Sequence, residues 1–428
     1  MLFILFYNIF VYPLIWAGAH LLALFNRKAR KGVVGRYRSL KAVRQYLALF
    51  PDIKERYLVH CASMGEFEHI KIFLRELKRL RPDSHTVVMF FSPSGYENVR
   101  EEEGIDLFIY TPFDGWIAMK RLFGLLSPRA LFIAKYDLWP NQIWTAHRRK
   151  VPAFLINATL SPKSSRLRPG IRELQRLLYR RLTGILAVAE TDRRNYEALA
   201  PRHLISVVGD TKYDQVLYRS ETAARTSLIP SAFYAGHQVF LAGSTWPEDQ
   251  VHLLPAAAEM LERFPELRLI VCPHEPTPEH LEDLTRKLAA FPTIRYSELA
   301  SYRNHRVIVI DKIGILAHLY SVAQIAYVGG SFRQNVHNVV EPAAYGIPVL
   351  FGPVNQNSHE AQHLKSAGGG FEVHNREQIE AHLRAFLEDG DFRRTAGLKA
   401  REVVRLHSGA TTRLLEDVFQ VLRKLRRS

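Results

Sequence analysis

The segment 325–353 constrains the fold of this chain more than any other part of the sequence. Two short apolar runs rich in β-branched residues, 325–328 and 348–351, flank a helix-forming stretch. This pattern predicts a βαβ unit with parallel strands. Gly329 and Gly330 follow the first run, where their backbone N–H groups can approach an anion closely and the next helix start adds partial positive charge.

The same segment predicts a site for a nucleotide-linked substrate. Glu341 falls near the first turn of the helix, where its carboxylate can accept hydrogen bonds from ribose hydroxyls. An anion cradle beside such a carboxylate suits a sugar or nucleotide phosphate. The candidate binding residues here are Gly329, Gly330, Ser331, Asn338 and Glu341.

A chain of 428 residues is too long for one ordinary core and fits two domains. Apolar strand-like runs alternate with helical patterns on both sides of a polar stretch at 218–236. Such alternation predicts doubly wound α/β domains with parallel sheets, each with a ligand crevice at the carboxyl ends of its strands. We expect the two domains to face one another across a cleft, with their boundary near residue 220.

The N-terminus predicts a membrane anchor. Residues 2–25 contain no Asp, Glu, Lys or Arg and are long enough to cross a bilayer as a helix, whereas 27–44 are rich in Lys and Arg without an acidic residue. The positive-inside rule then places the rest of the chain in the cytoplasm. A cleaved signal peptide and a shallow interfacial helix are the alternatives. With a formal net charge of +16, we expect anionic membrane lipids as partners rather than nucleic acid.

The rest of the sequence argues against a disulfide framework, a metal site and a Walker-type phosphate loop. Cys61 and Cys272 lie beside predicted strand ends, and two cysteines favour buried free thiols over a disulfide framework. His359 and His363 have helical spacing but lack the Glu of a zinc-protease helix, so we predict no metal. The chain has no Walker-type phosphate loop, and no cofactor is expected beyond the substrates.

A carboxylate follows the first predicted strand of the chain. In the loop 60–68, the small residues Ser63 and Gly65 bring the backbone close to a ligand, and Glu66 stands where a helix begins. The helix N-terminus favours the ionised form, and an ionised carboxylate can take a proton from an attacking hydroxyl. The alternative is that Glu66 only complements the helix dipole. Ser94 and Gly95, after the second strand, can likewise reach a substrate or form a plain turn.

The order of several motifs resembles the lipid A Kdo transferases, which are 3-deoxy-D-manno-octulosonic acid transferases. The motifs are the Ser-x-Gly-Glu loop at 63–66, Leu-Trp-Pro-Asn at 138–141, Asn-Ala-x-Leu-Ser at 157–161, Gly-Asp-x-Lys-Tyr-Asp at 209–214, Ala-Gly-Ser-Thr at 242–245, Val-Gly-Gly-Ser at 328–331 and Asn-x-x-Glu-Pro at 338–342. They occur in the family's order, and the resemblance as a whole extends from the N-terminal anchor to about residue 400.

This resemblance implies a GT-B glycosyltransferase at the inner membrane. Its domains would be an anchor at 1–26, an acceptor domain at 27–220 for the lipid A precursor (lipid IVA), a donor domain at 221–400 for CMP-Kdo and a basic helical tail at 401–428. It implies direct, inverting transfer with CMP as leaving group. Glu66 matches the general base, and Lys212 matches a position that stabilises charge in the transition state.

Three motifs depart from the family pattern. Lys135 and Asp137 stand where the family has Glu-x-Glu, so Lys135 reverses a charge. Either Asp137 takes over part of that role, or this subgroup arranges the corner differently. The CMP-contacting Pro-Arg-His-Pro becomes Pro-His-Glu-Pro, which makes His274 and Glu275 the candidate contacts. The Met-Gly-Glu loop becomes Ile313, Gly314 and Ile315, where contacts to the nucleotide would have to be through the backbone.

Two other functions remain open at this point. A nucleotide-sugar 2-epimerase shares the architecture and a similar donor cradle, although it needs neither a membrane anchor nor a lipid acceptor. A non-catalytic lipid-binding relative is the second alternative, which the charge reversal at Lys135 keeps open.

Overall fold

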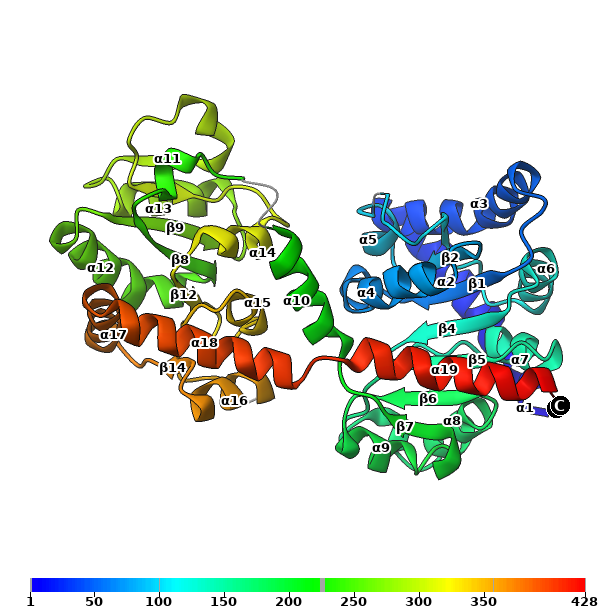
Figure 1. Ribbon diagram of the computed structural model, residues 1–428. Helices are drawn as coiled ribbons and strands as arrows, with labels where there is room; N and C mark the ends of the chain where they lie inside the picture. The colour runs from blue at the N-terminus through cyan, green and yellow to red at the C-terminus, as the bar shows by residue number, and fades with distance from the viewer. Residues whose placement is uncertain (1, 100, 224–227, 357, 428) are drawn as a thin grey trace. The chain divides into compact units, whose positions relative to one another are not determined.

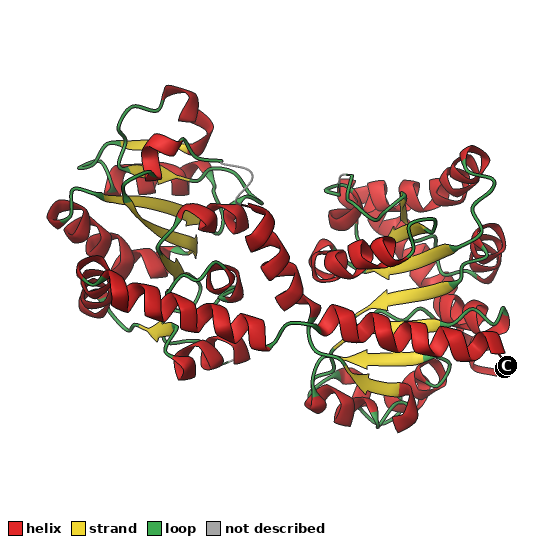
Figure 2. Ribbon diagram, viewed as in Figure 1, coloured by secondary structure: helices red, strands yellow, loops and turns green. Residues whose placement is uncertain are grey.

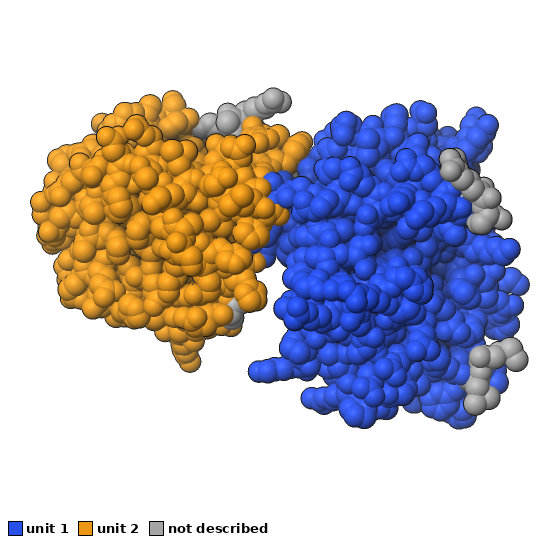
Figure 3. Space-filling view, turned by 60° about the horizontal axis from the view of Figure 1, so that its bottom comes forward, with its two compact units in different colours: residues 1–215, 408–428 blue, residues 216–407 orange. Residues whose placement is uncertain are grey.

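The computed structural model describes residues 2–99, 101–223, 228–356 and 358–427 (Figure 1). The chain forms two compact units (Figure 3). Residues 1–215 and 408–428 make the first unit, and residues 216–407 make the second. Each unit is built on a seven-stranded sheet whose neighbouring strands are all parallel, with helices packed around it (Figure 2).

The first sheet has the order β3-β2-β1-β4-β5-β6-β7. Its strands are β1 (Arg56–Cys61), β2 (His85–Phe90), β3 (Leu107–Tyr110), β4 (Ala130–Ala134), β5 (Ala153–Ala158), β6 (Gly184–Ala187) and β7 (Ile205–Val207). Alternate residues of one strand enter different cores: Leu58 lies in one apolar cluster, and Tyr57 and Val59 lie in another. Both faces are therefore buried, which explains the near-continuous apolar runs in the sequence.

Helices cover both faces of this sheet. They are α3 (Arg27–Leu49), α4 (Met64–Leu80), α5 (Pro93–Tyr96), α6 (Trp116–Leu126), α7 (Pro140–Arg148), α8 (Ile171–Tyr179), α9 (Glu190–Tyr196), the start of α10 (Thr211–Ala223) and, from the chain's other end, α19 (Ala410–Arg427). Leu414, Val418 and Leu422 of α19 lie in the same buried cluster as Phe73 and Leu77 of α4. The C-terminal helix thus completes the core of the first unit.

The N-terminal residues form one continuous helical stretch of α1 (Leu2–Phe6), a π-helical turn η1 (Tyr7–Val11) and α2 (Tyr12–Phe25). Phe3–Phe25 is long and apolar enough to cross a membrane. Polar side chains fasten it to the first unit: the Tyr7 hydroxyl donates to Asp114 (3.0 Å), and the amides of Asn8 and Asn141 bond reciprocally (3.0 and 2.9 Å). Its apolar residues remain mostly exposed, as the 74% exposure of Leu14 shows.

The second sheet has the order β10-β11-β9-β8-β12-β13-β14. Its strands are β8 (Gln238–Thr245), β9 (Leu267–Pro273), β10 (Thr293–Arg295), β11 (Val307–Val309), β12 (Ile325–Val328), β13 (Val349–Phe351) and β14 (Gly370–Glu372). The helices are α11 (Ser231–Tyr234), α12 (Pro247–Arg263), α13 (Pro278–Lys287), α14 (Leu316–Leu319), α15 (Val340–Ala344), α16 (His359–Ala367), α17 (Arg376–Glu388) and α18 (Gly390–Leu406).

The predicted βαβ unit is confirmed, because β12 and β13 pair in parallel with α15 between them. Cys61 and Cys272 are buried free thiols, as expected. The sequence did not indicate β7, β10 or β14. Each of these is a three-residue strand at the edge of its sheet, too short to show a periodic pattern.

Candidate active site

Glu66 lies at the carboxyl end of β1, in the first turn of α4. Ser63 caps this helix, its hydroxyl accepting from the Glu66 N–H (3.4 Å), at the spacing of a capping box. The Glu66 carboxylate is 6% exposed, and its Oε2 accepts from the Ala62 N–H (2.6 Å). The order of the sheet reverses between β1 and β4, so Glu66 stands at the switch point where open α/β sheets bind ligands.

The loop after β4 brings Asp137 to the same corner. Its Oδ2 accepts from the Trp139 indole (3.1 Å) and pairs with Nε2 of His60 (2.9 Å), a fully buried residue of β1 whose Nδ1 contacts the Thr111 hydroxyl (3.2 Å). Burial would raise the pKa of Asp137, but the hydrogen bonds from His60 and Trp139 lower it below its ordinary value. Asp137 is therefore an ionised, fixed carboxylate.

Groups in the same corner also shift the pKa of Glu66. Burial raises its pKa most, and the charge of Asp137 raises it further. The Ala62 N–H, His60 and Lys135 act in the opposite direction, and the net result is a pKa above the ordinary value. A carboxylate of this kind holds a proton more strongly than one in water.

Two lysines surround this corner. Lys135 follows β4 with a left-handed backbone (φ 60°), and its N–H donates to the Ile156 carbonyl (2.9 Å). Lys212 lies in the first turn of α10, 3.5 Å from Asp210. Thr211 fixes that turn against α4, because its hydroxyl donates to the carbonyl of His69, one turn after Glu66.

His69 also lies beside both lysines, and burial lowers its pKa to about 4, with Lys135 and Lys212 adding to the effect. His69 is thus neutral at neutral pH. The first unit therefore brings together the four residues expected to act in catalysis, Glu66, Lys135, Asp137 and Lys212.

Ser94 and Gly95 belong to the short helix α5. The Ser92 hydroxyl caps it by accepting from the Ser94 N–H (3.2 Å). Gly95 is buried, and a Cβ there would come within 2.2 Å of the Phe90 ring. Gly65, by contrast, is exposed, and a Cβ there would meet only the Ser63 hydroxyl, at an ordinary contact distance of 3.9 Å. Close packing on Phe90 thus accounts for Gly95, whereas Gly65 leaves the loop before Glu66 uncrowded.

In the second unit, an aromatic stack lies at the carboxyl end of β8. The ring of His274 stacks on both Trp246 (4.6 Å between centroids) and His337 (4.4 Å). The rings of Trp246 and His337 lie 6.5 Å apart and nearly parallel, and the Trp246 indole donates to Nε2 of His337 (2.9 Å). Burial lowers the pKa of His337, and His274 lowers it further. These flat rings form an aromatic surface suited to stacking against a nucleobase.

The N–H groups of Gly329 and Gly330 were expected to bind an anion, but the structure uses them inside the protein. The Gly329 N–H donates to the Gly243 carbonyl (2.9 Å), and the Gly330 N–H donates to Oδ2 of Asp249 (2.8 Å). Both donors are already used, which contradicts that expectation. Close approach explains the glycines instead: a Cβ on Gly329 would lie 2.4 Å from the Ser244 carbonyl oxygen.

Asp249 organises this loop from the first turn of α12. Its carboxylate accepts from the N–H groups of Gly330 and Trp246 (both 2.8 Å) and from the Tyr327 hydroxyl (2.8 Å). Burial raises the pKa of Asp249, although these donors partly offset the effect. The carboxylate therefore joins the ends of β8 and β12, where the order of the second sheet reverses.

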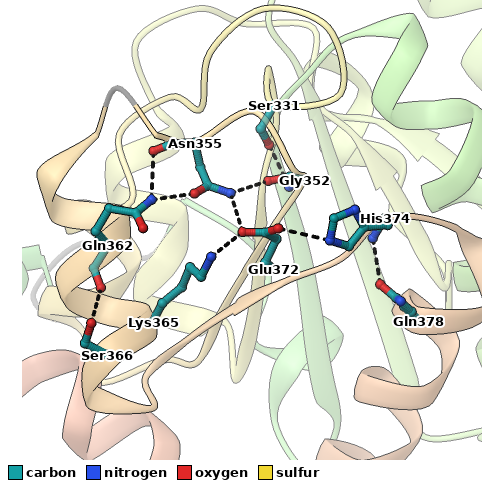
Figure 4. A network of polar contacts seen from close by, with 9 residues as sticks. All are labelled: Ser331, Gly352, Asn355, Gln362, Lys365, Ser366, Glu372, His374 and Gln378. Atoms are coloured by element: carbon teal, nitrogen blue, oxygen red, sulfur yellow. Dashed lines mark hydrogen bonds and ion pairs between the residues drawn. The ribbon is translucent and has the colours of Figure 1, made fainter.

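Ser331 is fully buried and anchors a polar network rather than facing open space (Figure 4). Its hydroxyl accepts from the Gly352 N–H (2.6 Å), and the Gly352 carbonyl accepts from the Asn355 amide (2.8 Å). The Asn355 amide also donates to Glu372 (2.9 Å), which pairs with Lys365 as well. The network fixes the loops that follow β12, β13 and β14 relative to one another.

The other predicted binding residues lie on loops of this unit. The side chain of Asn338, just before α15, accepts from the Val340 N–H (3.2 Å), and Glu341 in the first turn lies 3.4 Å from Arg219. The backbone carbonyl of Glu275 lies 3.0 Å from Nδ1 of His280. The loop of Ile313, Gly314 and Ile315 precedes α14, with Ile313 79% exposed and Gly314 left-handed (φ 90°).

Sequence reasoning missed four residues at these strand ends: His60, Trp246, Asp249 and His337. Their partners lie far away in the sequence, as with His60 and Asp137, 77 positions apart. Only Asp249 had a local signal, because Trp246 and Asp249 have capping-box spacing at the start of α12.

Comparison with known proteins agrees with the resemblance in the sequence. A family model described as 3-deoxy-D-manno-octulosonic-acid transferase (kdotransferase) matches residues 31–215. The chain is 30% identical to a 3-deoxy-D-manno-octulosonic acid transferase from Chlamydophila psittaci over 73% of this chain and 72% of the relative. A protein of the same description from Haemophilus influenzae is 27% identical over 84% and 85%.

The chain belongs to the 3-deoxy-D-manno-octulosonic acid (Kdo) transferase family. It is therefore a glycosyltransferase, and the alternatives of an epimerase and a non-catalytic relative are set aside. Family membership fits the corner of Glu66, Lys135, Asp137 and Lys212 built by the first unit.

Solved structures confirm the predicted fold class, a GT-B arrangement of two doubly wound α/β units. A UDP-GlcNAc 2-epimerase from Neisseria meningitidis, bound to UDP-GlcNAc, superposes with a TM-score of 0.60 over 85% of this chain and 100% of that one, at 14% identity. A glycosyltransferase from Rickettsia africae gives 0.53 over 88% and 100%, at 12% identity. At such low identity these matches define the fold alone.

Proposed function

We propose that this Kdo transferase moves Kdo from CMP-Kdo to the lipid A precursor lipid IVA during lipopolysaccharide synthesis, with Glu66 as general base. The observation that supports it most is the place of Glu66 at the switch point of the first sheet, near Asp137 and Lys135, with Lys212 beside His69 of the same helix. In this reaction a hydroxyl of the acceptor attacks the anomeric carbon of Kdo directly. CMP leaves from the opposite side, which inverts the configuration.

Glu66 takes the proton of the attacking hydroxyl. Burial and Asp137 raise the pKa of its carboxyl group, which strengthens it as a base, while the Ala62 N–H and Lys135 keep the ionised form accessible. Since Oε2 is bonded to the Ala62 N–H, Oε1 is the oxygen we assign to the proton transfer.

The cations beside Glu66 stabilise the donor. We assign Lys212 and Lys135 to the carboxylate that the donor carries and to the negative charge that develops on the leaving phosphate. Asp137 fixes the corner through His60 and Trp139 and takes over part of the role of the family's missing glutamate.

The two substrates are assigned to different units. The first unit would take the lipid acceptor, through Ser63, Gly65, Ser94 and Gly95. The second would take CMP-Kdo, with the nucleotide near the stack that includes His274. The remaining residues assigned to the donor substrate are Glu275, Ile313, Gly314, Ile315, Asn338 and Glu341, whereas Gly329, Gly330 and Ser331 shape the loop after β12 through their own hydrogen bonds.

We assign the N-terminal helix as an uncleaved anchor in the inner membrane, with the catalytic units on the cytoplasmic side. The basic helix α3 that follows it supports this orientation and suits contact with anionic lipid headgroups. No metal or cofactor is assigned a step in the reaction.

Glu66→Gln tests the general base. In CMP release from CMP-Kdo with tetraacyl lipid A precursor, we expect this variant to lose about 10²- to 10⁴-fold in kcat, because an amide cannot accept the proton. Its affinity for CMP-Kdo should stay within a few-fold. Glu68→Gln is the matched control, since Glu68 lies on the same helix paired with Lys71 (2.6 Å). Wild-type turnover by Glu66→Gln would refute the assignment.

A further inference from the structure

An apolar groove of about 270 Å³ runs beside the N-terminal helix of the first unit. Phe3, Phe6 and Val11 line one side, and Leu174 and Leu178 of α8 line the other. Its walls are largely aliphatic and aromatic, and Phe6 and Leu174 are 53% and 46% exposed. The groove is thus accessible from outside and suited to a hydrocarbon chain rather than a polar ligand.

One end of this groove reaches the catalytic corner. Asp137 and Trp139 belong to its lining, and both take part in the hydrogen bonds that hold Asp137 against buried His60. The charge of Asp137 acts on the pKa of Glu66, which places the proposed base close by. A ligand with its hydrocarbon chain in the groove would therefore present its polar end beside Glu66.

The surroundings of the groove are strongly basic. The segment 163–181, which includes α8, carries seven Lys or Arg residues and a single acidic residue, Glu173. Arg166 of this segment lies over the ring of Tyr136, next to Asp137 (4.7 Å from guanidinium carbon to ring centroid). Positive charge around an apolar groove complements a lipid with an anionic headgroup.

We propose that this groove binds one acyl chain of the anionic lipid acceptor and so positions the sugar hydroxyl at Glu66. The proposal rests on the proposed function, since it gives the acceptor's hydrocarbon chain a specific place on the enzyme. It assigns Leu174 and Phe6, on opposite walls, to recognition of the chain. Acyl-chain preference is then set by this groove and not by the bilayer alone.

The test measures binding rather than turnover. Monophosphorylated glucosamine acceptors with one acyl chain of four, six or eight carbons are used below their critical micelle concentration, with the full chain in nanodiscs and empty discs as blank. Each CH₂ buried on binding is worth about 0.8 kcal/mol, so affinity should rise about fourfold per CH₂ that enters the groove.

Leu174→Trp should fill the groove and remove most of that dependence on chain length. Leu177→Trp is the matched control, because Leu177 lies on the same helix with 37% exposure and does not line the groove. It should keep the wild-type dependence. Phe6→Trp, from the opposite wall, should act like Leu174→Trp, which guards against a local folding defect in α8.

Two results would overturn the proposal. One is an unchanged chain-length dependence in both Leu174→Trp and Phe6→Trp. The other is an equal loss in Leu177→Trp, which would mean that the whole face contacts bilayer lipid without a specific chain site. Binding is measured without turnover, so the two proposals can fail separately. Failure of wild-type protein to release CMP would refute the proposed function, whereas these affinities alone decide whether the groove binds an acyl chain.

Discussion

Asp114 links the N-terminal helix to the first unit, and its carboxyl group makes that unit's stability depend on pH. It is 6% exposed and accepts from the Tyr7 hydroxyl (3.0 Å) and from the N–H groups of Asn141 and Gln142 at the start of α7 (both 2.9 Å). Burial raises its pKa to about 7, although these donors offset part of the effect. We choose Asp114→Asn as the perturbation, because the amide has nearly the same shape and cannot ionise.

The sign and size of the effect follow from the pKa difference. In the unfolded chain the carboxyl ionises near pH 3.8, whereas in the folded unit it stays protonated until about pH 7. The folded state binds more protons between those values, so the free energy of unfolding falls as pH rises. The folded and unfolded pKa values differ by roughly three units, and each unit is worth about 1.4 kcal/mol. The total change in the free energy of unfolding is therefore about 4 kcal/mol.

The assay is thermal unfolding of both proteins in detergent between pH 4.5 and 7.5. One kcal/mol shifts the Tm of a unit of this size by about 2–4 °C. The Tm of wild type relative to Asp114→Asn should therefore fall by roughly 10 °C across this range, whereas other carboxyl groups cancel in the comparison. A difference in Tm that stays constant with pH would refute the reasoning, since Asp114 would then ionise as it does in the unfolded chain.

Two further substitutions test other parts of the structure. His60→Asn removes the hydrogen bond to Asp137 and should lower kcat/KM for CMP release about tenfold, the equivalent of about 1.5 kcal/mol. Because His60 lowers the pKa of Glu66, the acidic limb of the pH profile of kcat/KM should also move to higher pH. An unchanged pH profile would show that the pair of His60 and Asp137 is only structural. Gly397→Ala places a Cβ 2.0 Å from a backbone carbonyl oxygen and should destabilise the second unit by about 3 kcal/mol in thermal unfolding. Gly390→Ala, whose Cβ would meet nothing closer than 3.6 Å, should be nearly neutral, and equal melting of the two variants would contradict the packing argument.

Local patterns in the sequence predicted most of the architecture. Runs such as 130–134 and 325–328 are buried on both faces of a parallel sheet, so they contain little else than apolar residues. Glu66 was found for the same reason: a strand leads into a capped helix, and parallel strands end at one edge. The sequence could thus predict which strands end in loops that hold candidate catalytic residues.

The sequence could not predict partners brought together by long-range packing. The amphipathic pattern of α19 shows that Leu414 and Val418 need an apolar partner, but nothing local indicates that the partner is α4 of the first unit. Gly330 is similar: a glycine after a strand suggested an anion site, whereas its N–H is used by Asp249, 81 positions away. Hydrogen-bond competition of this kind is decided only in the folded unit.

The packing of α19 has a consequence for biosynthesis of the chain. Because translation proceeds from the N-terminus, the strands of the first unit leave the ribosome before residues 216–407, yet its apolar surface on α4 remains open until residues 408–428 have emerged. The first unit is thus begun first and finished last. A premature stop or a bulky fusion near the C-terminus would therefore leave the earliest-made part of the protein exposed to aggregation.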